Sequence, residues 1–330
     1  MSVVPSILFG SKSGKVWVML AALLLLGAVS CATAAPAPAA TLAAATPSTE
    51  LSEELNDGQD AISPLLATTL LRTGTQRVSF LLVSPTALVK APVAAVTSSY
   101  LDGDSGISET TQAVFHLWPY AIRGAYSTEL TFNQPGRWQL DISVDDAEFS
   151  GNTQLLLQVA GQVIVPDIGA IPPQSKTKTL ESEGGLKTLT TDFSPDPDLY
   201  LLSVEEAIND GKPAVIVFSS PAFCTSPTCG PQVDTVAELK DEHFGEANFV
   251  HVEVYDNPEE IQGDLSQARI TQAVTEWGFD QIPHWLNESW TYVLDSDGRV
   301  YQKFEGYVTL EELEEALQGV AAKGSSPFIQ

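Results

Sequence analysis

Residues 212–239 read KPAVIVFSSPAFCTSPTCGPQVDTVAEL. The run from Val215 to Phe218 is apolar and rich in β-branched residues, which predicts a strand buried on both faces of a sheet. A short polar loop follows this run and holds two cysteines, Cys224 and Cys229. After Gly230 and Pro231, apolar residues recur at helical spacing, at Val233, Val236 and Leu239. The stretch therefore predicts a strand, a cysteine loop and a helix, in that order.

Cysteines at the start of a helix have a distinctive chemistry. Free N–H groups and the positive end of the helix dipole favour thiolate over thiol. Thiolate is the nucleophile in disulfide exchange and the form that binds soft metals. For a cysteine pair in an exported protein, a structural disulfide or two buried thiols is the alternative. The position between a buried strand and a helix favours a functional pair.

From about residue 195 to residue 317 the chain resembles the exported, membrane-anchored members of the thioredoxin-like family. The matching features are the VIVF strand, a cysteine loop ending in CGP, a strand at 249–254, the hairpin WTYVLDSDGRVYQKFEG and a terminal amphipathic helix. The resemblance implies an α/β thioredoxin-like domain over residues 198–322. It also implies that Cys224 is the nucleophile and Cys229 the resolving thiol. That order stays open, because Cys229 directly precedes Gly-Pro at the helix start.

Two features depart from the pattern of this family. The family spaces its cysteines C-x-x-C, whereas here the spacing is C-x4-C. The family's cis-proline position falls at Ser289, and Pro283 lies too far upstream to replace it. By the same resemblance we expect Ser289, Trp290 and Pro231 to contact the substrate.

The loop 279–289, FDQIPHWLNES, is the second informative stretch. The resemblance places its side chains beside Cys224, including His284, Trp285 and Glu288. The strand before it, 249–255, alternates His251, Glu253 and Tyr255 with valines, which predicts an exposed-edge or partly covered strand. A capping box at Thr309 predicts the start of the last helix.

Three functions remain open for the cysteine pair. In the leading one, a thiol-disulfide oxidoreductase without cofactor, the pair cycles between dithiol and disulfide with the thiols or disulfides of other exported proteins. In the second, the chain resembles the Sco family of copper proteins, whose thioredoxin-like domains carry C-x-x-x-C and a distant histidine. Cys224, Cys229 and His284 would then bind Cu(I). In the third, the domain is a binding module with an inert disulfide.

The N-terminus carries the features of an export signal. Lys12 and Lys15 precede the apolar run 16–29, which is too short for a convincing membrane span. Small residues precede Cys31 and resemble a bacterial lipobox, although Ala28 stands where leucine is most usual. We expect residues 1–31 to be a lipoprotein-type signal sequence, Cys31 to be lipidated, and the body to be anchored in the bacterial cell envelope outside the cytoplasm. An ordinary signal peptide or an uncleaved anchor is the alternative.

Composition limits the function further. A chain of 330 residues is long enough for two domains with cores of their own. The formal net charge is -26 and the pI is about 4.2. Nucleic-acid binding is therefore not expected, because phosphate contacts depend on clustered Lys and Arg. Of three cysteines, one belongs to the leader and two share a loop, which is unlike a fold stapled by disulfides.

The middle of the chain predicts an all-β domain over residues 73–165. Short β-type runs alternate there with Pro/Gly turns, at 77–83, 113–117, 126–132, 138–144 and 154–159. This spacing predicts an antiparallel sandwich, immunoglobulin-like in outline. The flanking segments 32–72 and 166–197 are rich in Pro, Ser and Thr, and we expect a flexible tether and a linker.

Overall fold

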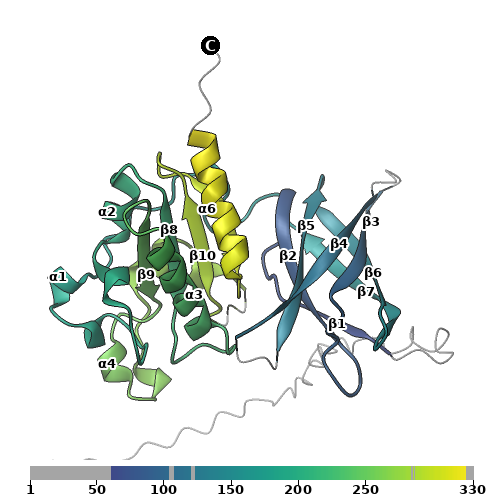
Figure 1. Ribbon diagram of the computed structural model, residues 1–330, viewed down its shortest axis with the longest axis horizontal. Helices are drawn as coiled ribbons and strands as arrows, with labels where there is room; N and C mark the ends of the chain where they lie inside the picture. Colours follow the sequence, from purple (N-terminus) through teal and green to yellow (C-terminus); the bar gives the residue numbers. More distant parts are fainter. Residues whose placement is uncertain (1–60, 104–107, 120–122, 284, 286, 325–330) are drawn as a thin grey trace, which may run out of the picture. The chain divides into compact units, whose positions relative to one another are not determined.

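The computed structural model describes residues 61–103, 108–119, 123–283, 285 and 287–324 (Figure 1). These residues belong to one compact unit, Leu55–Gln330. Two sheets organise them, one of seven strands and one of four. The predicted signal sequence, Cys31 and residues 32–60 of the predicted tether lie outside the described residues. Within the described ranges, no helix has the length and apolar character needed to cross a membrane.

The first sheet is a single antiparallel ladder. Its strands follow the order β1-β2-β5-β4-β3-β6-β7, and each pair along that order is antiparallel. The two ends of the sheet approach each other, because Arg72 and Ala160 form a bridge and the Thr73 amide donates to the Ala160 carbonyl at 3.0 Å. The sheet is therefore nearly closed. The strands are β1 (Ser63–Leu66), β2 (Gly74–Val83), β3 (Val93–Tyr100), β4 (Ser108–Leu117), β5 (Gly124–Phe132), β6 (Gly136–Asp145) and β7 (Ser150–Val159).

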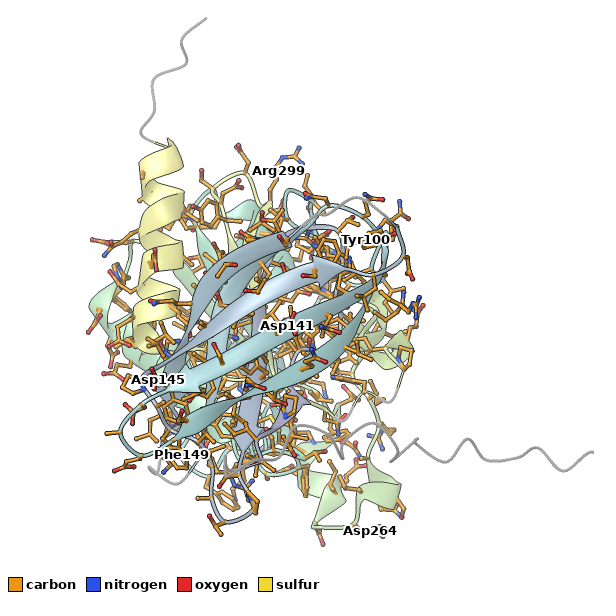
Figure 2. The ribbon with its side chains drawn as sticks, turned by 90° about the vertical axis from the view of Figure 1, so that its right-hand side faces the viewer. Tyr100, Asp141, Asp145, Phe149, Asp264 and Arg299 are labelled. Atoms are coloured by element: carbon orange, nitrogen blue, oxygen red, sulfur yellow. A yellow bond between two sulfur atoms is a disulfide. The ribbon has the colours of Figure 1, made fainter. Side chains whose placement is uncertain are left out.

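Alternation along β6 explains how this sheet builds a core. Trp138, Leu140 and Ile142 are buried, whereas the residues between them face outward. Figure 2 shows the outer face with Asp141 near its middle, where the amides of Gln139 and Gln154 donate to Asp141 at 2.9 and 2.8 Å. A period of two places apolar residues on the inner side of the curled sheet and polar residues in solvent.

The immunoglobulin-like sandwich predicted for this region is wrong. A sandwich requires two sheets that face each other, but here all seven strands belong to one hydrogen-bonded sheet. Strand β3 makes the difference, because it pairs with both β4 and β6 and so joins the two halves of the ladder. Its sequence, VAAVTSSY, is built of small and hydroxyl-bearing residues, so its strand character was missed.

The second sheet has the order β11-β10-β8-β9. Its strands, near the positions predicted from the sequence, are β8 (Ala214–Ser219), β9 (Asn248–Glu253), β10 (Trp290–Leu294) and β11 (Val300–Glu305). Only β8 and β9 are parallel, and α3 (Cys229–Glu242) connects them. The other two pairs, β8–β10 and β10–β11, are antiparallel.

The α/β thioredoxin-like fold class is also wrong. The described chain is mostly β, and beside the second sheet only α3 and α6 (Leu310–Gly324) exceed six residues. Helix α5 (Gln272–Glu276) has five residues. Helical content is therefore too low for a clear α/β thioredoxin fold. The remaining helices are α1 (Leu180–Glu183), α2 (Val204–Asn209) and α4 (Pro258–Ile261), with 3₁₀ turns at Leu186–Thr188, Pro197–Tyr200, Leu265–Gln267 and Phe279–Gln281.

Strand β8 carries a core on each of its faces. Val215 and Val217 pack with apolar residues of α3 and α6, including Val236 and Leu313. Ile216 and Phe218 point the other way and pack with Trp277, Phe279 and Tyr292. This two-sided burial is the reason for the unbroken apolar run in the sequence. It also fixes the position of the cysteine loop, which begins where β8 ends.

Residues 166–197 run along the second sheet. The Gly169 amide donates to the Val300 carbonyl at 2.7 Å, and the Val300 amide donates to Ala170 at 2.9 Å. The Trp277 indole N–H donates to the Pro173 carbonyl at 3.1 Å. These contacts hold the connecting segment against β11 and the aromatic core.

Candidate cysteine site

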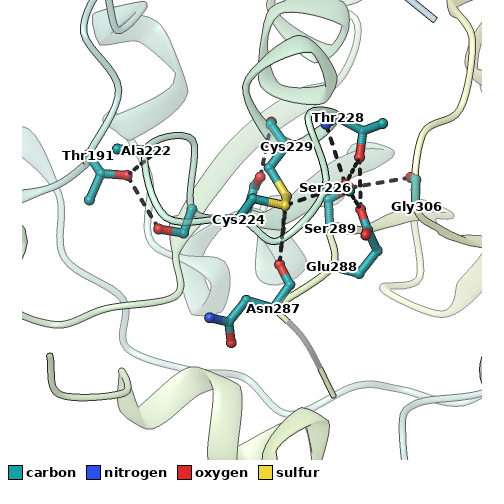
Figure 3. Close-up of a disulfide and its surroundings, with 12 residues drawn as sticks. Thr191, Ala222, Cys224, Ser226, Thr228, Cys229, Asn287, Glu288, Ser289 and Gly306 are labelled. Atoms are coloured by element: carbon teal, nitrogen blue, oxygen red, sulfur yellow. Dashed lines mark hydrogen bonds between the residues drawn. A yellow bond between two sulfur atoms is a disulfide. The ribbon is translucent and has the colours of Figure 1, made fainter. Parts of the chain in front are cut away.

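The end of β8 and the start of α3 hold the cysteine loop. Ser219, the last residue of β8, is fully buried, and its hydroxyl donates to the Cys229 carbonyl at 3.0 Å. Cys229 is the first residue of α3. A disulfide joins Cys224 to Cys229 across a Cα–Cα distance of 6.0 Å (Figure 3). The predicted pairing geometry is therefore reached at the helix start without loss of the helix.

The two sulfurs differ in exposure. Cys229 is completely buried, whereas Cys224 is half-buried. A thiol arriving from solvent therefore meets Cys224 first. Disulfide exchange requires in-line attack on an accessible sulfur, so this difference favours Cys224 as the reacting position.

The carbonyl of Asn287 faces both sulfurs. Its oxygen lies 3.7 Å from Cys224 Sγ and 3.6 Å from Cys229 Sγ (Figure 3). Asn287 has a left-handed backbone with φ 58°, which asparagine adopts more readily than most residues. Its side-chain amide donates to the Tyr255 hydroxyl, which holds the loop in this conformation. After reduction, the same carbonyl would lie within reach of either S–H group.

A carboxylate also lies beside the sulfurs. The Sγ atoms of Cys224 and Cys229 and a carboxylate oxygen of Glu288 all lie within 4.8 Å of one another. The hydroxyls of Ser226 and Thr228 donate to Glu288 Oε1 at 2.7 and 2.8 Å. Two charge-assisted hydrogen bonds of this kind fix the carboxylate in place. They also tie the cysteine loop to the loop before β10.

A buried acid supports the loop from below. Glu253 is the last residue of β9 and pairs in register with Ser219 of β8. The Thr191 amide and hydroxyl donate to Glu253 Oε2 at 2.8 and 2.7 Å, and Thr191 Oγ1 also accepts from the Ala222 amide at 3.2 Å. Burial raises the pKa of Glu253 to about 7, despite these donors. The Glu253–Thr191–Ala222 chain therefore links β9 to the first residues of the cysteine loop.

His251 lies next to this acid and is also buried. Its Nε2–H donates to the Ser219 carbonyl at 3.2 Å, which leaves Nδ1 to accept from the Tyr200 hydroxyl at 2.7 Å. Burial lowers the pKa of His251 to about 4, so the ring is neutral near pH 7. The expectation of an exposed or partly covered strand was wrong here. β9 is an edge strand, but the turn Pro197–Tyr200 packs against it and covers His251.

The structure buries the other expected site residues. Ser289 and Trp290 are 0% and 2% exposed, and Pro231 is buried in the first turn of α3. Their side chains offer no surface to a partner in this conformation. Ser289 instead pairs with Gly306, whose amide donates to the Ser289 carbonyl at 2.8 Å. His284 and Cys31 lie outside the described residues.

Sequence reasoning missed three of the groups around the disulfide: Asn287, Ser226 and Thr228. The hydroxyl residues between the two cysteines were the available signal. Hydroxyls at alternate positions of a tight loop often bind a neighbouring acceptor. The acceptor here, Glu288, is 60 residues away from Thr228 in the sequence. The sequence alone therefore could not identify Glu288 as the acceptor for these hydroxyls.

Comparisons with known proteins identify no family for the chain. No family model matches it, and no curated protein matches it. Among solved structures, it is similar to a β-glucosidase from Listeria innocua, with 12% identity and a TM-score of 0.19, over 32% of this chain and 16% of that one. It is also similar to the fibronectin type-III domain of human fibronectin type III domain containing protein 3. That match has 9% identity and a TM-score of 0.19, over 33% of this chain and 94% of that one.

Proposed function

We propose that the protein performs thiol-disulfide exchange with other proteins outside the cytoplasm, through Cys224 and Cys229. The observation that carries this proposal is the disulfide itself, which joins a partly exposed residue, Cys224, to a buried one, Cys229, at the start of α3. A purely structural bridge has no need for an accessible sulfur. The short sequence separation of 5 residues also constrains the unfolded chain little.

The exchange proceeds in two balanced steps. A thiolate of the partner attacks Cys224 Sγ, a mixed disulfide forms, and the Cys224–Cys229 bond breaks with Cys229 leaving as thiolate. A second partner thiolate then attacks the partner's own sulfur in the mixed disulfide and releases Cys224 as thiolate. The partner loses two electrons and becomes a disulfide, while this protein becomes a dithiol. The reverse sequence reduces a partner disulfide.

The surroundings of the pair assist these steps. The N-terminal N–H groups of α3 and its dipole stabilise a thiolate on Cys229, which lowers the barrier to its departure. No acidic residue occupies the first turn of α3. The Glu288 carboxylate beside the sulfurs acts in the opposite direction to the helix dipole and limits this effect. Protonation of either thiolate gives an S–H group, which can donate a hydrogen bond to the Asn287 carbonyl.

We further propose that the protein works in the cell envelope, held to the membrane by a lipid on Cys31. The leader and its lipobox-like end support this location. A stable disulfide also favours an oxidising compartment. The partners are then exported proteins that carry thiols or disulfides, and the acidic composition argues against nucleic acid.

The decisive experiment is trapping of the mixed disulfide. Cys229→Ser leaves Cys224 as a thiol without a resolving partner. It should attack a peptide supplied as its disulfide, release one half of that disulfide as thiolate and accumulate a mixed disulfide with the other half, detected by mass spectrometry. Cys224→Ser is the matched control and should react at least about tenfold more slowly, because Cys229 is buried. Wild type should cycle reversibly in a glutathione redox titration. Failure of Cys229→Ser to form any adduct would exclude exchange and leave an inert disulfide as the better description.

Metal binding by the reduced pair is the second candidate, and one observation favours it. Glu288 completes a set of three candidate ligands with Cys224 and Cys229. A carboxylate beside two thiolates suits Zn²⁺ better than Cu(I), which prefers soft ligands alone. Titration of the reduced protein with Cu(I) and with Zn²⁺ separates the two ions, using Glu288→Gln and His284→Ala. Loss of tight Cu(I) binding in His284→Ala would support the copper-binding function. Weakened Zn²⁺ binding in Glu288→Gln alone would support a zinc site formed by Cys224, Cys229 and Glu288.

A further inference from the structure

A cavity opens beside the disulfide, on the side of Glu288. Its volume is about 290 Å³. The cysteine loop contributes Ser226 and Thr228 to its wall, and Glu288 stands between this wall and the sulfurs. The first sheet contributes Leu66, Ser79 and Leu81 to the wall, and the segments that follow β1 and β4 contribute Ala67, Thr69 and Trp118. Such a volume lies at the lower end of the roughly 300–1,000 Å³ of ligand pockets, so it suits one side chain.

The described wall of the cavity is acidic, and the largely buried Lys303 acts electrostatically on one of its two carboxylates, Glu305. Glu288 and Glu305 both line the cavity, and none of the described lining residues is Lys, Arg or His. Burial raises the pKa of Glu305 to about 7, and the negative charge of Glu288 adds to this rise. The two carboxylates therefore lie close enough to repel each other. A cation placed between them would relieve this repulsion.

Another part of the wall is apolar and aromatic, beside the hydroxyl-bearing part. Leu66 and Leu81 approach from the first sheet, and Trp118 and Trp285 add indole surface. The indole nitrogen of Trp285 is buried without a hydrogen-bond partner among the described groups. Aromatic and aliphatic surface around a carboxylate pair matches a side chain with an apolar stem and a cationic head. Lysine and arginine are the side chains of that kind.

We propose that this cavity binds a lysine or arginine side chain of the partner polypeptide, next to the cysteine that exchanges with Cys224. This inference rests on the proposed exchange function and names its substrate class. The cationic head lies against Glu288 and Glu305, and the stem lies along Leu81 and Trp118. The acidity of the chain as a whole, with a net charge of -26, adds long-range attraction for a basic segment. Partners are therefore selected by a basic residue beside the reactive cysteine.

The test compares two peptides that differ only in charge. Ala-Arg-Cys-Ala-Ala and the same peptide with citrulline in place of arginine react with the oxidised protein, and the rates of adduct formation are measured. A neighbouring arginine also activates the peptide thiol by itself. Each peptide's rate with the protein is therefore divided by the rate at which the same peptide reacts with oxidised β-mercaptoethanol. Wild type should favour the arginine peptide by about tenfold, as for one charge-assisted contact.

Variants then place the preference in the cavity. Glu288→Gln and Trp118→Ala should each reduce the ratio to about two or less. Trp118 follows β4 and lies outside the cysteine loop, so its effect cannot come from altered sulfur chemistry. Glu259→Gln removes an exposed carboxylate of α4 and should leave the ratio unchanged.

Serine analogues of the two peptides separate this inference from the exchange function. They cannot react, and their binding is followed by the indole NMR signals of Trp118 and Trp285. Tighter binding of the arginine analogue, lost in Glu288→Gln, would support the cavity assignment even if no peptide exchanged. Equal rates and equal binding of both peptides would overturn it while leaving exchange intact. A preference that survives both cavity variants would overturn it as well.

Discussion

At the scale of single residues, the site depends on ionisable groups that burial has altered. Glu253 and His251 lie side by side on β9, beneath the cysteine loop, and both are buried. Burial disfavours the charged form of each, so the pKa of Glu253 rises to about 7 and that of His251 falls to about 4. Near pH 7 the histidine is neutral and the acid is partly protonated. The protonation of Glu253 and His251 is therefore coupled to folding.

This coupling gives a pH prediction for Glu253→Gln. Between pH 4.5 and about 7 the folded protein keeps a proton on Glu253 that the unfolded chain releases. The stabilising contribution of Glu253 is thus complete below pH 4.5 and is lost as pH rises through 7. From pH 5 to pH 8 wild type should lose more stability than Glu253→Gln, by on the order of 2–3 kcal/mol. Urea unfolding at both pH values measures this.

A matched variant controls for unrelated titrations. Glu259→Gln removes an exposed carboxylate in α4. Its pH dependence should follow wild type. An equal loss of stability in Glu253→Gln and wild type would mean that Glu253 is already ionised in the folded protein at pH 5.

At the scale of elements, the disulfide closes only the loop between β8 and α3. In the chain-entropy description, closing a loop of this length stabilises the folded state by about 2 kcal/mol. We therefore expect Cys224→Ser/Cys229→Ser to fold, with a free energy of unfolding lower by about that amount. Denaturant unfolding of the variant and of reduced wild type should agree. A much larger loss in the variant would show that the pair is chiefly structural.

Helix α6 is held by its apolar stripe, and this gives a second prediction at the scale of elements. Leu313 is fully buried against Val217 and Val236, whereas Leu310 is only partly buried. Leu313→Ala should cost about 3 kcal/mol of stability, because a cavity remains in a packed core. Leu310→Ala on the same helix should cost less than half as much. Equal costs would mean that α6 packs less closely than its burial indicates.

At the scale of the whole molecule, two carboxylates join the sheets. Arg77 of β2 donates to Glu312 of α6 at 2.8 Å, and the Ser127 hydroxyl of β5 donates to the same carboxylate at 3.0 Å. Burial alone would raise the pKa of Glu312, but the Arg77 charge and hydrogen bonds hold that pKa below its usual value. Glu305 of β11 accepts the Thr69 amide at 2.8 Å. These contacts join β2 and β5 to α6, and the segment after β1 to β11.

Removal of Arg77 tests this connection. Arg77→Ala leaves Glu312 poorly solvated and unpaired, so we expect a loss of about 2–3 kcal/mol. Arg137→Ala breaks an exposed pair with Asp102 and should cost about 0.5 kcal/mol. Scanning calorimetry should also show one transition for wild type and a broader or divided one for Arg77→Ala. An unchanged single transition with less than about 1 kcal/mol lost would mean that the two sheets fold independently of this pair.

The sequence alone located the cysteine pair and most of the strands, but not β1 or β3. The apolar run 215–218, the alternation over 138–144 and the cysteines before a helical pattern are local signals, set by side-chain period and backbone propensity. Tertiary structure decided the fold class, because strand pairing joins residues far apart in the chain, and a weak strand such as β3 turns two expected sheets into one. It also decided the surroundings of the sulfurs: burial of Glu253 and the approach of Asn287 and Glu288 depend on loops that meet only after the second sheet has formed.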